Sequence, residues 1–331
     1  MTAAAKVFPP RESLTRVPLS TAELPPLDLS RPPWPGELVA SGGVRAHVRR
    51  IPGPGEGAST AVYVHGLGGS ATNWTDLAAQ LAGRFAGIAV DLPGFGRSAP
   101  SAGYDFSLAA HAATVTAFVD GLGVAPVHLF GHSLGGTIAL AVAAGRPDLV
   151  RSMTLISPAM PDLRPDLRRI ADRRLPLTFL PFVGGRIRAQ LAALTPREQA
   201  EQILRLCFVR PWLIPEHRVH EGVQEIIERD GLPYYRSALT ATALGLIRSW
   251  LAPPARSLWR VASTVSVPTL VVWGAQDRVV SVRKAPRTAR LLPRGRLLVL
   301  PRTGHCAQIE RPVTVARAVL GMVEAVDGHQ W

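Results

Sequence analysis

Cysteine is nearly absent from this sequence of 331 residues. Only Cys207 and Cys306 are present, so there is no disulfide framework of the kind that small secreted domains need. No run reaches about 18 uninterrupted apolar residues, which argues against a transmembrane helix. The first ten residues hold one lysine followed by prolines and no apolar stretch, so no signal peptide is predicted. From these absences we expect a cytoplasmic protein.

Lysine is also scarce, because all basic residues except Lys6 and Lys284 are arginines. The net charge of +13 nevertheless does not predict nucleic-acid binding, since the first half of the chain is nearly neutral. We interpret the densest basic group as a solvated helix face, with weak peripheral contact to an anionic membrane or an acidic substrate as the alternative. That group comprises Arg283, Lys284, Arg287, Arg290, Arg294 and Arg296.

The hydrophobic content of 47% and the charged content of 18% are typical of a packed globular protein. Residues 1–37 are rich in proline and predict an extended arm. Residues 38–159 and 261–331 alternate short apolar runs with helical patterns, which predicts a mostly parallel sheet covered by helices on both faces. Residues 160–260 contain helical segments and no convincing strand, so we expect an inserted helical cap there.

The motif Gly131-His132-Ser133-Leu134-Gly135 lies directly after an apolar strand pattern and directly before a helical pattern. A sharp strand-to-helix turn strains the backbone at its central residue, and the flanking glycines let the chain pass without Cβ clashes. The serine hydroxyl is thereby presented at the N-terminus of a helix, whose dipole favours negative charge. We therefore predict that Ser133 is a nucleophile.

A serine nucleophile needs a base that is held by a third group. His305 follows the last predicted strand and Asp277 follows the strand before it, so both lie at carboxyl ends of strands, where open α/β sheets place their sites. The chain order Ser, Asp, His is the order expected of a strand–Ser–helix elbow in this kind of sheet. We predict His305 as the general base and Asp277 as its acid partner. Asp162, after the strand that follows Ser133, is the alternative acid.

A glycine-rich loop, His65-Gly66-Leu67-Gly68-Gly69, follows an earlier predicted strand. Bare backbone in such a loop lets amide N–H groups face a developing oxyanion. We assign the predicted oxyanion hole to the amides of Leu67 and Leu134. Because these donors belong to the backbone, their side chains are nearly unconstrained.

These motifs together resemble the successive landmarks of α/β-hydrolase-fold enzymes, from about residue 38 to the end and excluding most of the cap. The resemblance implies an eight-stranded sheet, a lid over the site, and neither a cofactor nor a metal. Members that remove halide from haloalkanes or open epoxides carry an aspartate in place of Ser133, so those activities are disfavoured. The segments that carry the resemblance are His65-Gly66, Asp91-Leu92-Pro93-Gly94-Phe95-Gly96-Arg97-Ser98, Gly131-His132-Ser133-Leu134-Gly135-Gly136, Gly274-Ala275-Gln276-Asp277 and Gly304-His305.

The reaction implied is acyl transfer through an acyl-enzyme on Ser133, which predicts a serine esterase acting on a small hydrophobic ester or thioester. Two alternatives stay open for the same triad, namely carbon–carbon bond hydrolysis and cofactor-free perhydrolysis. The segment that begins at Gly304 resembles that of the carbon–carbon hydrolases, which have tryptophan at the position of Cys306. A non-catalytic ligand-binding homologue is a third alternative, and the oligomeric state stays open. The predicted substrate pocket comprises Gly66, Trp74, Phe179, Phe182, Trp212, Tyr234 and Cys306, although aromatic residues of a cap also pack its helices together.

Overall fold

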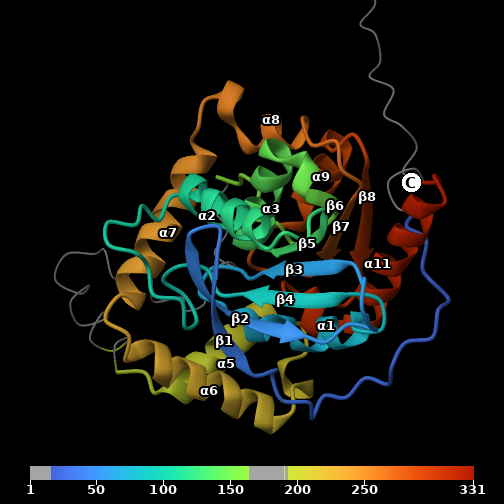
Figure 1. Cartoon of the computed structure of the whole chain (residues 1–331). Helices are drawn as coiled ribbons and strands as arrows, with labels where there is room; N and C mark the ends of the chain where they lie inside the picture. Colours follow the sequence, from blue (N-terminus) through green and yellow to red (C-terminus); the bar gives the residue numbers. More distant parts are fainter. Residues whose placement is uncertain (1–15, 164–189, 191–192) are drawn as a thin grey trace, which may run out of the picture.

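The computed structural model describes residues 16–163, 190 and 193–331, and its centre is one eight-stranded sheet (Figure 1). The strand order is β1-β2-β4-β3-β5-β6-β7-β8. Strands β3 to β8 pair in parallel, whereas β2 pairs antiparallel with both β1 and β4. This confirms the predicted mostly parallel sheet. The strands are β1 (Gly36–Ser41), β2 (Val44–Ile51), β3 (Thr60–Val64), β4 (Ala86–Val90), β5 (Val127–His132), β6 (Val150–Ile156), β7 (Thr269–Gly274) and β8 (Gly295–Leu300).

Strand β1 was not predicted from the sequence. It forms a hairpin with β2 through Gly42 and Gly43, which both have positive φ. Most side chains of β1 are exposed, so the strand carries no alternation of apolar and polar residues. The expected arm therefore ends at Pro35, two residues earlier than the sequence indicated.

Helices cover both faces of the sheet. Helices α2, α3, α8 and α9 contribute to the apolar cluster on one face, and α1 and α11 contribute to the cluster on the other. Strands β3, β5 and β7 are buried along their whole length, which explains why most of their residues are apolar. The core helices are α1 (Thr75–Leu81), α2 (Leu108–Gly121), α3 (Leu134–Gly145), α8 (Leu258–Ala262), α9 (Ala285–Leu291), α10 (Ala307–Glu310) and α11 (Pro312–Asp327).

Among the described residues between β6 and β7, three α-helices precede α8, and we call them the inserted helices. They are α5 (Pro196–Cys207), α6 (Glu216–Asp230) and α7 (Tyr235–Trp250). Helix α5 begins with a capping box, in which Thr195 and Glu198 satisfy each other's backbone N–H groups, and Pro196 occupies the first helical position. Helices α5 and α6 pack against each other, and Figure 1 draws them below strands β1 and β2. The described helices are all too short or too polar to cross a lipid bilayer.

The described part of the N-terminal arm, residues 16–35, lies on the core (Figure 1, blue trace). Ser20 N–H donates to the Arg317 carbonyl of α11 at 2.9 Å. The side chain of Gln80 in α1 donates to the Pro25 carbonyl at 3.1 Å. Farther along, the Leu29 carbonyl accepts hydrogen bonds from two residues of α6. The arm thus connects the last core helix with an inserted helix.

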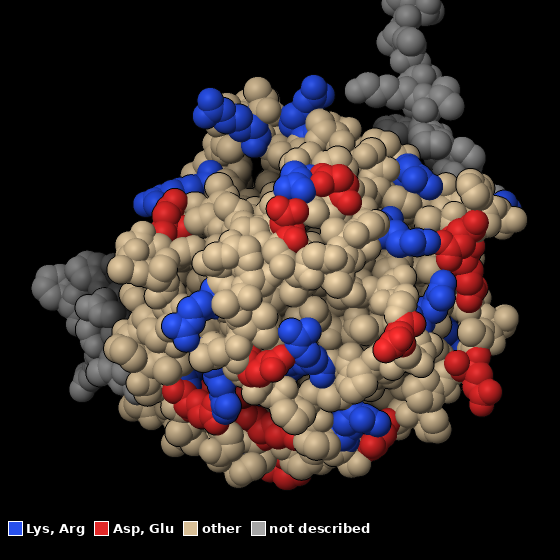
Figure 2. All heavy atoms as spheres, in the orientation of Figure 1, with Lys and Arg blue, Asp and Glu red and all other residues tan. Residues whose placement is uncertain are grey.

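On the face shown in Figure 2, basic and acidic side chains are interspersed.

Candidate active site

Ser133 occupies the turn between β5 and α3, with φ 52° and ψ −115°. This left-handed backbone is rare for a residue with a side chain and is held by the surrounding chain. A Cβ on Gly131 would lie 2.3 Å from the Gly135 carbonyl oxygen, and one on Gly135 would lie 2.2 Å from that of Val64. Both glycines are therefore required by close backbone contacts. The sequence predicted this strained turn, and the structure places Ser133 at its apex.

The glycine-rich loop after β3 lies directly beside this turn. A Cβ on Gly66 would come within 3.1 Å of the Ser133 Cβ atom. The loop therefore carries Leu67, and the start of α3 carries Leu134, close to the serine. Leu134 is buried, and the side chain of Leu67 is exposed. The assignment of the two backbone amides to an oxyanion hole stays a prediction.

His65 fixes the glycine-rich loop from inside the protein. The Leu92 N–H donates to Nε2 of His65 at 3.0 Å, so the other nitrogen, Nδ1, carries the hydrogen and donates to the Gly66 carbonyl at 2.7 Å. Burial lowers the pKa of His65, although the charge of Asp91 acts in the opposite direction. A neutral ring with one defined tautomer thus holds the loop against the segment that follows β4.

His305 and Asp277 meet at the carboxyl ends of the last two strands. Nδ1 of His305 lies 2.9 Å from Oδ2 of Asp277, and both side chains are buried. The other oxygen of Asp277 accepts the backbone N–H groups of Val279 and Val280 at 2.8 and 2.9 Å. The carboxylate is thus held from two sides. It orients the imidazole so that Nε2 is available for proton transfer.

The carboxylate also controls the protonation of His305. Burial disfavours the charged ring, but the charge of Asp277 and its hydrogen bond outweigh burial and raise the pKa of His305 above its usual range. An imidazolium formed during a reaction is therefore stabilised in place. Among the hydrogen bonds of the described residues there is none between the Ser133 hydroxyl and the His305 ring. Such bonds are often long in ligand-free enzymes and tighten when substrate binds.

The alternative acid, Asp162, lies elsewhere. Its carboxylate forms an ion pair with Lys284 at 3.1 Å and is almost fully buried. The structure therefore pairs His305 with Asp277 rather than with Asp162.

His132, the residue before Ser133, contacts the residue predicted as the base. Its Nε2 lies 3.1 Å from the His305 carbonyl oxygen, and the two rings are 4.6 Å apart. Burial and the neighbouring His305 keep the pKa of His132 well below its usual range, so the ring is neutral. His132 thus holds the backbone of the residue predicted as the base.

We call the loop after β8 that carries His305 the histidine loop. Two further contacts of this loop left no recognisable signal in the sequence. Glu310 accepts the Gly304 N–H at 2.6 Å and the Val209 N–H at 3.2 Å, so one carboxylate joins the loop to the inserted segment. In addition, the His305 N–H donates to the Cys207 carbonyl at 2.7 Å, at the end of α5. The inserted helices thus contact the loop that carries the candidate base.

Comparison with known proteins gives the family directly. The family model described as "alpha/beta hydrolase fold" matches residues 62–312, which include Ser133, Asp277 and His305. The chain belongs to the α/β-hydrolase fold family. The predicted resemblance is confirmed at this level.

Individual relatives are distant. A dihydrolipoyllysine-residue acetyltransferase component of an acetoin cleaving system from Pseudomonas putida is 31% identical over 81% of this chain, and the match spans only 64% of that relative. A monoacylglycerol lipase of Xenopus laevis is 27% identical over 82% of this chain and 78% of the relative. The solved structure of a meta-cleavage product hydrolase from Pseudomonas fluorescens IP01 superposes with a TM-score of 0.69 at 19% identity, over 88% of this chain and 98% of that one. This likeness shows the fold.

The residues predicted to line the substrate pocket of this α/β-hydrolase-fold protein lie in different environments. Trp74 is fully buried and packs on Tyr63 and Phe130 in the core, which corrects its assignment to the pocket. Trp212 is 74% exposed and points to solvent, which corrects its assignment as well. Tyr234 is half-buried at the start of α7. Phe179 and Phe182 lie outside the described residues.

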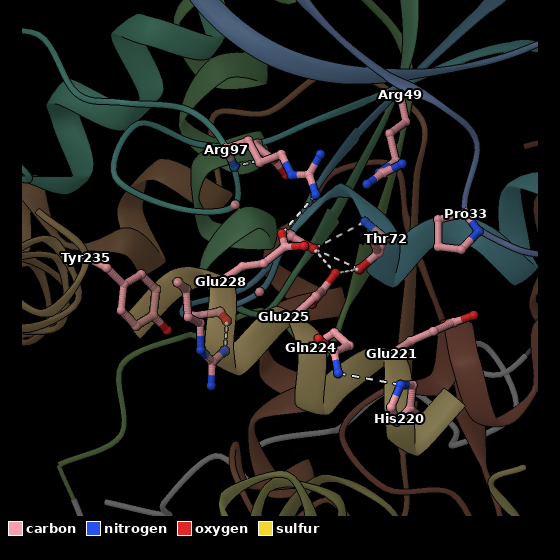
Figure 3. A pocket seen from close by; sticks show the side chains of 16 residues that line it. Pro33, Arg49, Thr72, Arg97, His220, Glu221, Gln224, Glu225, Glu228 and Tyr235 are labelled. Carbon is pink, nitrogen blue, oxygen red and sulfur yellow. Dashed lines mark hydrogen bonds and ion pairs between the residues drawn. The ribbon is translucent and has the colours of Figure 1, made fainter. Parts of the chain in front are cut away.

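A cavity of 230 Å³ lies between the glycine-rich loop and α6 (Figure 3). Most of the residues that line it are polar or charged. Oε1 of Glu225 accepts the hydroxyls of Thr72 and Ser70 at 2.6 and 3.1 Å, and burial raises the pKa of Glu225 against the effect of these bonds. Arg229 donates to the Gly68 carbonyl at 3.2 Å. The cavity therefore marks a polar attachment of α6 to the loop that carries Leu67.

Among the described residues no group of side chains suits a metal ion.

Proposed function

We propose that this protein hydrolyses a carboxylic ester with an apolar acyl group, through an acyl-enzyme on Ser133. The observation that carries this proposal is the buried pair of His305 and Asp277, at 2.9 Å, beside the strained turn that presents Ser133. A buried histidine held by a carboxylate, next to a serine at a helix N-terminus, is the arrangement that activates a hydroxyl for attack on a carbonyl.

The reaction proceeds in two similar halves. The Ser133 oxygen attacks the ester carbonyl carbon while Nε2 of His305 takes the hydroxyl proton, and the charge of Asp277 stabilises the imidazolium. The amides of Leu67 and Leu134 donate to the oxyanion of the tetrahedral intermediate. The intermediate collapses, and the alcohol leaves with the proton from His305. Water then attacks the acyl-enzyme with the same proton transfers and releases the acid and free Ser133.

The preference for an apolar acyl group is supported by the side chains near the glycine-rich loop. A Cβ on Gly68 would lie 3.5 Å from both Leu239 and the Tyr235 hydroxyl, so α7 packs over this loop. The exposed side chain of Leu67 lies in the same loop. The similarity to a monoacylglycerol lipase supports the same class of substrate. In this proposal the inserted helices form the lid of the site.

The test is labelling with a fluorophosphonate probe, combined with turnover of nitrophenyl esters of increasing chain length. We expect wild type to be labelled and Ser133→Ala to be unlabelled, with a loss of turnover of about 10⁶-fold. Ser237→Ala, an exposed serine on α7, is the control and should be labelled like wild type. Ester turnover by Ser133→Ala at the wild-type rate would refute the proposal. Labelling without ester turnover, accompanied by cleavage of a dienoic diketone, would instead indicate carbon–carbon hydrolysis.

A further inference from the structure

The two cysteines of the chain lie together beside the candidate base. Cys207 ends α5, and Cys306 directly follows His305 in the loop after β8. The two segments are joined at this point, because the N–H of His305, the neighbour of Cys306, donates to the Cys207 carbonyl at 2.7 Å. A Cβ on Gly304 would lie 2.3 Å from the same carbonyl oxygen, so the loop can approach α5 only with glycine at that position. The Cys306 thiol is hydrogen-bonded to the sulfur of Cys207.

The two sulfurs have different surroundings. Cys306 is buried, whereas Cys207 is half-buried. The hydrogen bond from Cys306 lowers the pKa of the Cys207 thiol, and the neighbouring His305 acts in the same direction although burial opposes it. The same hydrogen bond, together with burial, raises the pKa of Cys306. Cys207 is therefore the better nucleophile, and Cys306 is the thiol that keeps its proton.

We propose that Cys207 and Cys306 form a reversible redox switch, in which oxidation by a hydroperoxide closes a disulfide between α5 and the histidine loop and inhibits hydrolysis. In the first step the Cys207 thiolate attacks the outer peroxide oxygen, the O–O bond breaks, and with one proton an alcohol or water leaves and Cys207 becomes a sulfenic acid. In the second step the Cys306 sulfur attacks the sulfenic sulfur, and the thiol proton leaves with the hydroxyl as water. The peroxide is reduced, and the two thiols are oxidised.

Inhibition follows from the position of the disulfide. The S–S bond is about 2.05 Å long, much shorter than a hydrogen-bonded contact between two sulfurs. Closing the bond therefore draws the histidine loop and the end of α5 toward each other. Cys306 is covalently next to His305, so the ring of His305 moves relative to Ser133. A displacement of about 1 Å at a catalytic group can lower a rate by about 100-fold. This part of the inference rests on the proposed function.

The experiment uses the full-length protein, reduced and then treated with hydrogen peroxide, after which remaining thiols are alkylated. Intact mass should show the loss of two hydrogens and no alkylation in the monomer. Turnover of a nitrophenyl ester should fall at least tenfold, and dithiothreitol should restore it. A melting temperature above that of the reduced form would support a new cross-link. The mass and the melting temperature are read without any substrate, so failure of the disulfide is distinguished from failure of the ester proposal.

Serine substitutions separate the roles of the two cysteines. Cys306→Ser should accumulate a sulfenic acid on Cys207 that dimedone traps, and Cys207→Ser should form none. The double variant should keep its own turnover after peroxide treatment, which also controls for oxidation of other residues. Two alkylated thiols after peroxide treatment of wild type, or a disulfide only between two chains, would overturn the proposal. A complete intramolecular disulfide with unchanged turnover would overturn the proposal that the disulfide inhibits hydrolysis.

Discussion

Nε2 of His132 donates a hydrogen bond to the carbonyl of His305 across 3.1 Å, so the residue before the candidate nucleophile holds the candidate base. The carbonyl can only accept, which places the hydrogen of His132 on Nε2. Its Nδ1 lies 3.0 Å from where a Cβ of Gly66 would be. The ring thus links the nucleophile turn, the glycine-rich loop and the histidine loop.

We expect His132→Leu to lower kcat about tenfold with little change in KM, because one hydrogen bond to the His305 backbone is lost. His132→Gln retains an N–H donor and should recover part of the rate. Steady-state kinetics on one ester checks both values. Equal rates for the leucine and glutamine variants would mean that the ring acts by packing alone.

The charge of Asp277 should be visible in the pH dependence of hydrolysis. Because the base must be neutral and the pKa of His305 is raised, the acid limb of kcat/KM should have its midpoint above 6.5. In Asp277→Asn the negative charge is lost, and burial then lowers the pKa of His305. The midpoint of the acid limb should therefore move to lower pH, and kcat should fall by about 10⁴-fold. Asp162→Asn is the control, and its acid limb should coincide with that of wild type. A midpoint unchanged in Asp277→Asn would contradict the assignment.

Gly135 should be intolerant of a side chain. A Cβ at this position meets two backbone oxygens, those of Val64 and His65, at 2.2 and 2.5 Å. Gly135→Ala should therefore lower the free energy of unfolding by about 2 kcal/mol. Gly145→Ala, at the other end of α3, meets nothing within 4 Å and should leave stability unchanged or slightly higher. Urea unfolding of both variants measures the difference, and equal midpoints would refute the packing argument.

An ion pair between Arg218 of α6 and Asp76 of α1 should contribute to stability. The two side chains are 2.9 Å apart and mostly buried. Arg218→Met leaves the carboxylate unpaired and should reduce the free energy of unfolding at pH 7 by about 2 kcal/mol. The pair of Arg97 and Glu228 is more than half exposed, so Arg97→Met should cost at most about 0.5 kcal/mol.

The effect of Arg218→Met should depend on pH. Burial raises the pKa of Asp76 above 3.8, and Arg218 partly counteracts this rise. Without Arg218 the folded-state pKa rises further, while the unfolded value stays the same. The difference in stability between wild type and variant should therefore grow as the pH rises above 4, and shrink in acid where Asp76 is protonated. A difference that does not change between pH 4 and 7 would contradict this reading.

The parts of the site that depend on local chain geometry were predictable. Ser133 was recognisable because a strand-to-helix turn needs glycines at fixed offsets, and Asp277 and His305 because they follow apolar strands. Contacts between distant segments were not predictable, such as Glu310 with Val209. Aromatic residues were also ambiguous, because Trp74 fills the core and Trp212 faces solvent although the sequence treats both alike.

The N-terminal arm links the last core helix to an inserted helix through hydrogen bonds. It is attached to α11 through Ser20, and its Leu29 carbonyl accepts hydrogen bonds from His217 and Arg218 of α6. Helix α6 therefore has a non-covalent anchor outside the sheet. A large outward swing of α6 must break these bonds or pull the arm off the core. Movement of α6 away from the core and release of the arm are thus coupled.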